Sequence, residues 1–148
     1  MKISVPDNSP KILDLISDIL KNYKTIAVVG LSSNPSRPSF GVTRYMQSSG
    51  YRIIPVNPNE TEALGEKCYK RLEDIPKSEP IEIVDIFRRS SDIPPVVDSA
   101  INVGAKVIWM QQGIENPTAA AKARAAGLIV IEDACILIEH RLRFPNRE

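Results

Sequence analysis

A cluster of small, polar and basic residues follows the first strongly apolar run of the chain. Gly30 permits a tight turn, Ser32 and Ser33 come next, and Arg37-Pro38-Ser39 opens a segment of helical period. Free amides at a helix N-terminus, serine hydroxyls and a guanidinium group together favour an anion such as phosphate. The alternative is structural, with the last serine only capping its helix and the arginine only solvating a rim. We predict a phosphate-binding turn at residues 30–39.

Three more groups of polar residues follow apolar runs in the same way. They are Asn57-Pro58-Asn59, Arg88-Arg89 and Gln111-Gln112-Gly113. If the apolar runs are parallel strands, their carboxyl ends meet at one edge, where doubly wound sheets bind ligands. The two arginines then bring further guanidinium groups to the same rim. Four strand ends that converge on phosphate-binding residue types favour a ligand with several phosphates.

Two common nucleotide motifs are absent from the sequence. A dinucleotide site has the pattern G-x-G-x-x-G and an acidic residue after the second strand. Here Ser32 stands in place of the second glycine and Asn57 in place of the acid, which disfavours NAD. The P-loop pattern G-x-x-x-x-G-K-[ST] does not occur either.

The candidate nucleophiles and bases have poor support as catalytic groups. Cys68 has no supporting partner, and Cys135 is interpreted as a buried, inert thiol. His140 lies among charged residues and is interpreted as exposed or simply packed. Asp85, at the end of an apolar run, must be hydrogen-bonded, and Glu132-Asp133 is interpreted as a solvated loop. We predict no catalytic residue and no metal site.

Five short apolar runs are the elements that position these residues. They cover residues 25–29, 51–56, 81–87, 105–110 and 128–131, and they are rich in Ile and Val without polar alternation. Such runs are typical of parallel strands that are covered on both faces. Helical patterns separate them, and three of these end at Gly50, Gly104 and Gly127. We predict an α/β fold of Rossmann-like, doubly wound type, with a five-stranded mostly parallel sheet and helices on both faces.

The remaining segments complete this prediction. Ser9-Pro10 is predicted to open a first helix, and residues 134–142 are predicted to form a closing one. Residues 57–77 are expected to form a loop with short helical turns. Trp109, Tyr45 and Tyr51 are expected in the core. Residues 1–148 are interpreted as a single domain.

Composition limits the classes of partner. The chain has 148 residues, 43% hydrophobic and 25% charged, with a net charge of +1. This is a globular composition without a general field for nucleic acid or a membrane surface. The two cysteines fit neither a disulfide framework nor zinc spacing, and no signal peptide or membrane-length run is evident. We therefore expect a cytoplasmic protein, with a homodimer or a protein partner left open.

Several specific strings resemble a known family. They are IAVVGLS at 26–32, RPS at 37–39, GYRIIPVNP at 50–58, LGE at 64–66, VDIFRR at 84–89, WMQQG at 109–113 and AGL at 126–128. The sequence is similar to single-domain coenzyme A-binding proteins, which resemble the N-terminal CoA-binding domain of the succinyl-CoA synthetase α subunit. The similarity runs from about residue 24 to residue 135.

This resemblance implies a ligand and a placement for it. The turn at 30–39 is expected to receive the phosphates of coenzyme A. Pro55-Val56-Asn57-Pro58 is expected to line the adenine side, Phe87 and Arg88 to border the nucleotide, and residues 110–113 to lie toward the pantetheine arm. Arginine suits the 3′-phosphate, and prolines and phenylalanine suit a ring.

The departure from the synthetase also matters for function. That enzyme carries its phosphorylated histidine in a second domain, whereas the one histidine here, His140, lies in a terminal segment. The resemblance therefore implies a protein that binds CoA or an acyl-CoA as a carrier, sensor or subunit. Three alternatives stay open, namely an NADP-linked oxidoreductase, a CoA-thioester enzyme with an unrecognised site, and a structural or regulatory protein with a vestigial pocket.

Overall fold

A twisted six-stranded sheet forms the centre of the protein. The structure, a computed structural model, describes residues 1–145 of the 148. The strands are β1 (Lys2–Ser4), β2 (Thr25–Val29), β3 (Arg52–Val56), β6 (Ile83–Ile86), β7 (Val107–Met110) and β8 (Ile129–Glu132), in the spatial order β1-β8-β7-β6-β2-β3. The five strands from β2 onward are mutually parallel. Numbered along the chain, they run 2-1-3-4-5, which is a doubly wound order. The predicted Rossmann-like α/β fold is confirmed.

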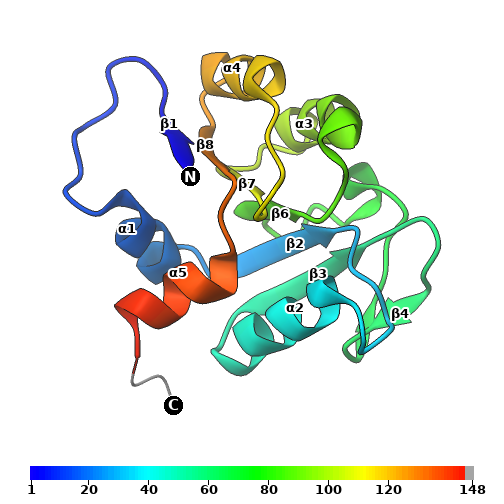
Figure 1. The fold of residues 1–148 in the computed structure, drawn as a ribbon. Coiled ribbons are helices and arrows are strands. Elements are labelled where there is room, and N and C mark those ends of the chain that lie inside the picture. The colour runs from blue at the N-terminus through cyan, green and yellow to red at the C-terminus, as the bar shows by residue number, and fades with distance from the viewer. Residues whose placement is uncertain (146–148) are drawn as a thin grey trace.

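Helices cover both faces of this sheet, as Figure 1 shows. One face packs against α1 (Leu15–Asn22), α2 (Pro38–Ser48) and α5 (Ile136–Arg143). The other packs against α3 (Ile93–Asn102) and α4 (Pro117–Ala125). Successive apolar residues of the parallel strands enter opposite cores, so that Val28 joins the first and Val29 the second. This two-sided burial is the physical reason for the continuous apolar runs in the sequence.

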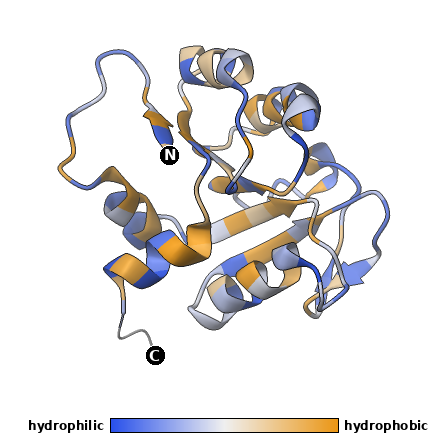
Figure 2. Cartoon of the chain, in the orientation of Figure 1, coloured by the Kyte–Doolittle hydropathy of each residue, from blue (hydrophilic) through white to orange (hydrophobic). Residues whose placement is uncertain are grey.

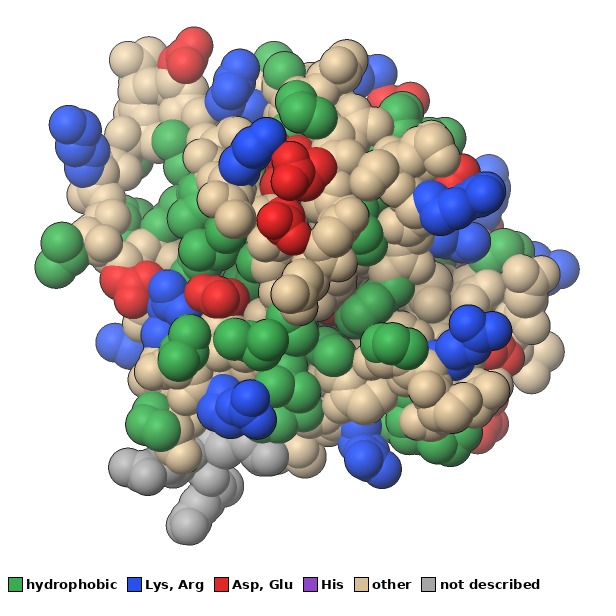
Figure 3. Space-filling model, viewed as in Figure 1, with side chains coloured by type: hydrophobic (Ala, Val, Ile, Leu, Met, Phe, Trp, Pro, Cys, Tyr) green, Lys and Arg blue, Asp and Glu red, His purple; other side chains and the backbone are tan. Residues whose placement is uncertain are grey.

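Figure 2 shows hydrophobic colour along β2 and hydrophilic colour in the hairpin near β4. The basic and acidic side chains in Figure 3 are interspersed on the visible face, in keeping with the small net charge. None of the helices in residues 1–145 is long and apolar enough to cross a membrane.

The prediction of five strands missed the sixth, β1. This strand pairs antiparallel with β8, with Ile3 opposite Ile131, and so extends the sheet at its edge. Lys2 adds an ion pair with Glu115 at 3.0 Å. A segment of three largely exposed residues carries no periodicity, so the sequence pattern could not indicate it.

The first helix begins later than predicted. Helix α1 starts at Leu15 rather than near Pro10, and its N-cap is Asp14, whose carboxylate accepts a hydrogen bond from the Ser17 amide at 3.2 Å. Ile12 is exposed and Leu13 completely so. Because β1 lies at the far edge of the sheet, residues 5–14 must lead the chain back to α1, and they cannot also be helical. The loop they form stands away from the body in Figure 1.

The irregular connection between β3 and β6 agrees with the prediction for residues 57–77. It contains a small hairpin, β4 (Glu62–Ala63) and β5 (Glu66–Lys67), and a 3-10 turn, η1 (Leu72–Asp74). Leu72 is buried in the core beneath α3. A second 3-10 turn, η2 (Ser90–Asp92), leads into α3.

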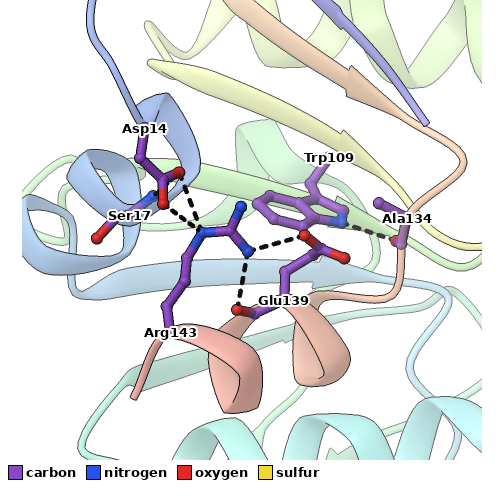
Figure 4. Close-up of polar contacts among 6 residues, drawn as sticks. All are labelled: Asp14, Ser17, Trp109, Ala134, Glu139 and Arg143. Atoms are coloured by element: carbon purple, nitrogen blue, oxygen red, sulfur yellow. Dashed lines mark hydrogen bonds and ion pairs between the residues drawn. The ribbon is translucent and has the colours of Figure 1, made fainter.

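The closing helix was predicted at residues 134–142 and is observed as α5. Figure 4 shows how Arg143 fastens it to α1. The Arg143 Nε donates to both carboxylate oxygens of Asp14 at 3.1 Å, and its Nη1 donates to Glu139 Oε1 at 2.8 Å. Trp109, which is fully buried as predicted, donates its indole N–H to the Ala134 carbonyl at 2.9 Å.

His140 is packed inside the molecule rather than exposed. Its Nδ1 shares a hydrogen bond of 2.9 Å with the Tyr45 hydroxyl, and its ring meets those of Tyr45 and Tyr51 edge-on. Tyr51 is buried as predicted, and burial raises its pKa to about 12. Tyr45 is partly buried.

Candidate functional site

The predicted site residues lie at the carboxyl ends of the parallel strands, and those that follow β2, β3 and β6 surround the point where the strand order reverses. From β2 the chain proceeds to β3, whereas from β6 it proceeds through β7 to β8 in the other direction. Loops that diverge in this way leave the crevice in which doubly wound sheets hold ligands. The Gly30 amide donates to the Val56 carbonyl, and the Phe87 amide donates to the Val29 carbonyl, both at 2.8 Å. The exits of three strands are thus tied together.

The predicted tight turn at Gly30 is confirmed, and its cause lies within the protein. Gly30 has a φ of +87°, in the left-handed region that favours glycine. A Cβ atom at this position would lie 2.2 Å from the carbonyl oxygen of Phe87. The glycine therefore lets the first turn approach the exit of β6, whatever it also does for a ligand.

Hydrogen bonds within the protein already engage the serines of the turn. The Ser32 amide donates to the Ser39 hydroxyl at 3.0 Å, and Ser39 is buried. The amide and hydroxyl of Ser33 both donate to the Glu60 carboxylate, at 2.7 and 2.8 Å. Both bonds lower the pKa of the Glu60 carboxyl, and the bond from the Ser33 backbone amide has the larger effect. Sequence reasoning missed Glu60, because only the fold brings it beside the turn.

The N-terminus of α2 is the part of this turn that stays open. Arg37 holds the N-cap position without a capping side chain, and Pro38 is the first helical residue. The Arg37 guanidinium is exposed and forms no ion pair or hydrogen bond with any residue in 1–145. Pro38 has no amide hydrogen and the Phe40 amide donates to the Arg37 carbonyl at 3.1 Å, so the Ser39 amide, the helix dipole and an unpaired cation are what this end offers to an anion.

A cleft of about 650 Å³ opens on the α3 side of the sheet, and Val29, the last residue of β2 before the turn, lines it, whereas no residue of 30–39 does. Apolar residues from β2, β3, η1 and α3 form most of its wall, and its charged residues are three cations and one acid. The lining residues are Val29, Val56, Pro58, Lys70, Arg71, Leu72, Arg88, Asp92, Pro95, Val96 and Ser99. Three predicted residues, Val56, Pro58 and Arg88, thus come together here. Sequence reasoning missed Lys70 and Arg71.

The structure separates the two arginines that follow β6. Arg88 is partly buried, lines the cleft, and forms no ion pair or hydrogen bond through its guanidinium with residues 1–145. Arg89 is exposed, and its Nε donates to the Asp92 carboxylate at 3.1 Å. The pairing of Arg89 neutralises Asp92, so Arg88 is left as the open cation at this wall of the cleft.

Other predicted residues hold the loops in place. Asn57 donates from Nδ2 to the Leu31 carbonyl at 3.0 Å and accepts from the Asn59 amide at 2.9 Å. Pro55 is buried within β3, and Phe87 is partly buried against the α2-side core. Asn57 therefore fixes the loops after β2 and β3, and Pro55 and Phe87 pack below the strand ends.

Gln111 is buried and joins two elements through its side chain. Its Nε2 donates to Asp85 Oδ1 at 2.5 Å, and its Oε1 accepts from the Ile136 amide at the start of α5 at 3.4 Å. The expected hydrogen-bonded role of Asp85 is confirmed. Burial raises the pKa of this carboxyl to about 7.

Gln112 and Gly113 are exposed and lie apart from the cleft. The Gly113 amide donates to Asp133 Oδ1 at 2.7 Å. Gln112 borders a smaller cavity of about 220 Å³ together with Cys135. Cys135 was predicted to be buried, but it is only partly buried. Cys135 is the first residue before α5, so it lies at a loop rather than inside the sheet.

Two other titratable residues have structural settings. Glu132 was predicted in a solvated loop, but it is the last residue of β8, is buried, and accepts from the Asn116 amide at 2.9 Å. Cys68 is buried, and burial raises the pKa of its thiol. Within residues 1–145 no group of three or more His, Cys, Asp or Glu side chains is arranged to hold a metal ion.

Comparison with known proteins places this geometry in a family. The model of the CoA binding domain matches residues 24–141, most of the chain and all of the strand ends described above. The chain belongs to the CoA-binding domain family. The expected relation to single-domain members of this family is confirmed.

Three relatives illustrate the range of the family. The uncharacterized protein YneT of Bacillus subtilis is 46% identical over 125 residues, which cover 84% of this chain and 91% of that protein. A hypothetical protein from Pyrococcus horikoshii has a solved structure with a TM-score of 0.86 and 39% identity, covering 97% of this chain and 99% of that one. The ADP-forming acetate–CoA ligase II of Archaeoglobus fulgidus is 31% identical over 85 residues, 56% of this chain but 12% of the ligase. The CoA-binding domain thus occurs in small proteins of this size and within much longer ligases.

Proposed function

We propose that the protein binds coenzyme A or an acyl-CoA at the carboxyl ends of β2, β3 and β6. The observation that carries the proposal is the cleft of about 650 Å³ at the ends of these strands, whose wall is mainly apolar and whose cation Arg88 is unpaired. The uncapped N-terminus of α2 follows the same β2 strand end. An apolar surface suits the adenine ring, and a helix N-terminus with two unpaired guanidinium groups suits a diphosphate. Membership of the CoA-binding domain family supports the same ligand.

The ligand has one arrangement that fits these features together. The adenosine lies in the cleft against Val29, Val56 and Pro58, and the diphosphate lies between Arg88 and the α2 N-terminus with Arg37. The pantetheine arm then leaves along the exposed strand ends, where residues 112–113 lie on the surface. In this arrangement apolar contacts bind the adenine base, and the cations bind the phosphates.

The role that we propose is binding, as a carrier, sensor or subunit. Asp85 is buried and bonded to Gln111, and His140 is packed against Tyr45 on the opposite face of the sheet from the cleft. Each of these acid–base groups therefore has a structural partner and lies away from the proposed nucleotide. Burial raises the pKa of the Cys68 thiol, which disfavours the nucleophilic thiolate.

Titration calorimetry tests this proposal on the purified chain after bound ligand is removed. We expect micromolar or tighter binding of coenzyme A and acetyl-CoA, and no comparable binding of NAD, NADP or ATP. Arg88→Ala is expected to weaken coenzyme A by about tenfold or more, since it removes charge-assisted hydrogen bonds. The matched control is Arg124→Ala, which removes an exposed arginine on α4 and is expected to change nothing.

Binding of NADP without coenzyme A would overturn the proposal and favour an oxidoreductase. Equal effects of the Arg88 and Arg124 variants would show that the ligand lies elsewhere. Hydrolysis or transfer of the acyl group of acetyl-CoA by the wild type, lost in Cys135→Ala without loss of binding, would instead favour a thioester enzyme.

A further inference from the structure

The cleft carries positive charge at two separate ends. Arg88 stands at one end, where the chain leaves β6. Lys70 and Arg71 stand at the other end and come from the connection between β5 and η1. No sequence motif indicated this second pair, which the fold alone brings to the cleft.

The pairing of the backbone sets the separation of the two ends. Tyr69 forms a parallel bridge with Val56, donates its amide to the Pro55 carbonyl at 3.0 Å, and accepts from the Asn57 amide at 2.8 Å. It therefore lies beside β3 like one more strand, and Lys70 follows it directly. Tyr69 lies three strand spacings from β6, with β2 and β3 between them, so the backbones of β6 and Tyr69 are roughly 14 Å apart. Residues at both ends line the cleft, and the space between them suits a nucleoside.

The acids around the second end leave its charge largely uncompensated. Lys70 forms no ion pair with any residue in 1–145, and the one ion pair of Arg71 within those residues is with Asp74, at 3.4 Å, while its charge also acts on neighbouring Glu73. Glu73 accepts from the Asn102 side chain at 3.4 Å. Asp92, the acid that lines the cleft, is bound to Arg89. The cleft therefore offers two cationic centres with an apolar wall between them.

Coenzyme A carries phosphate on both sides of its ribose, a diphosphate at the 5′ carbon and a monophosphate at the 3′ carbon. We propose that Lys70 and Arg71 recognise the 3′-phosphate and make the site selective for coenzyme A over dephospho-coenzyme A. This inference rests on the proposed function, in which the diphosphate lies at the Arg88 end. A lysine point charge and a planar guanidinium together suit a terminal phosphate with three free oxygens. Arg88, by contrast, serves both ligands alike.

Calorimetric titration of coenzyme A and dephospho-coenzyme A into three proteins tests the inference. They are the wild type, the double variant Lys70→Ala/Arg71→Ala, and the control Lys77→Ala/Lys106→Ala, which removes the same charge from exposed positions at the opposite end of the sheet. The wild type and the control are expected to prefer coenzyme A by about tenfold or more. The double variant is expected to lose this preference while its affinity for dephospho-coenzyme A stays within about twofold.

The smaller pair 3′-phosphoadenosine 5′-phosphate and AMP provides a second measurement with the same expected pattern. Equal binding of coenzyme A and dephospho-coenzyme A by the wild type would overturn the inference but leave the proposed function intact. So would a double variant that still prefers coenzyme A, or an Arg88→Ala variant in which the preference disappears. Failure of the wild type to bind either ligand would overturn the proposed function and the inference together.

Discussion

Replacement of Asp85 by asparagine removes a carboxyl group from the core and keeps an oxygen in place for Gln111. Asp85 is 1% exposed, and the Gln111 amide is its side-chain partner. Burial disfavours the charged carboxylate and raises the pKa from 3.8 to about 7, although the hydrogen bond from Gln111 acts in the opposite direction. At neutral pH and above, the folded protein must therefore hold a charge that the unfolded chain would place in water.

The sign and size of the effect follow from this difference. Between pH 4 and pH 7 the folded state binds more protons than the unfolded chain at this site, so stability falls as the pH rises. The stabilisation is fully present below about pH 4, and it is lost by about pH 7. A difference of about three pH units corresponds to about 4 kcal/mol. The asparagine side chain of the variant is neutral at every pH, so the variant does not undergo this loss in the free energy of unfolding as the pH rises.

Urea unfolding of the wild type and of Asp85→Asn at several pH values measures the effect. We expect the two proteins to have similar free energies of unfolding near pH 4. The advantage of the variant should then grow by about 1.4 kcal/mol per pH unit up to about pH 7. Asp98→Asn is the matched control, because Asp98 is exposed and paired with Lys122. A difference between wild type and Asp85→Asn that does not change with pH would refute the reasoning.

Three further variants test separate contacts, and urea unfolding measures each of them. Gly30→Ala should lower the free energy of unfolding by about 2 kcal/mol or more, because its Cβ meets the Phe87 carbonyl and its φ is left-handed; an unchanged value would mean that the turn can move away. Thr43→Val should raise it by about 1 kcal/mol, since the buried Thr43 hydroxyl has no hydrogen-bond partner in residues 1–145. A loss of stability would show that the hydroxyl is satisfied, for instance by water. Arg143→Met should lower it by about 1 kcal/mol by freeing α5 from Asp14, and no change would show that the aromatic contacts of α5 suffice.

The sequence was most informative where both faces of the sheet are buried. The run Thr25–Val29 is buried at every position, so the four residues after Thr25 form an unbroken apolar string, which is typical of a strand covered on both faces. Glycines 50, 104 and 127, all with left-handed φ, mark helix ends for a local backbone reason. Signals of this kind are contained within a few neighbouring residues and survive in the sequence alone.

The features that the sequence did not reveal depend on contacts between distant segments. β1 is specified by its pairing with β8, more than 120 positions away along the chain. Glu60 meets Ser33 because the strands β2 and β3 are neighbours, and Lys70 reaches the cleft because Tyr69 pairs with β3. Charged residues in loops have many possible partners, and only the fold selects among them.

At the predicted site, too, the sequence could not show which polar residues have partners within the protein. A buried polar group at a strand end must find a partner, and the protein itself satisfies Ser39, Asn57 and Gln111. The sequence pattern cannot separate such groups from those that wait for a ligand, because both kinds are polar and follow strands. What distinguishes Arg37 and Arg88 is that neither guanidinium has a partner in residues 1–145. In this fold the serine hydroxyls and side-chain amides therefore hold the loops together, whereas these two guanidinium groups stay unpaired, and salt would weaken their attraction for an anion.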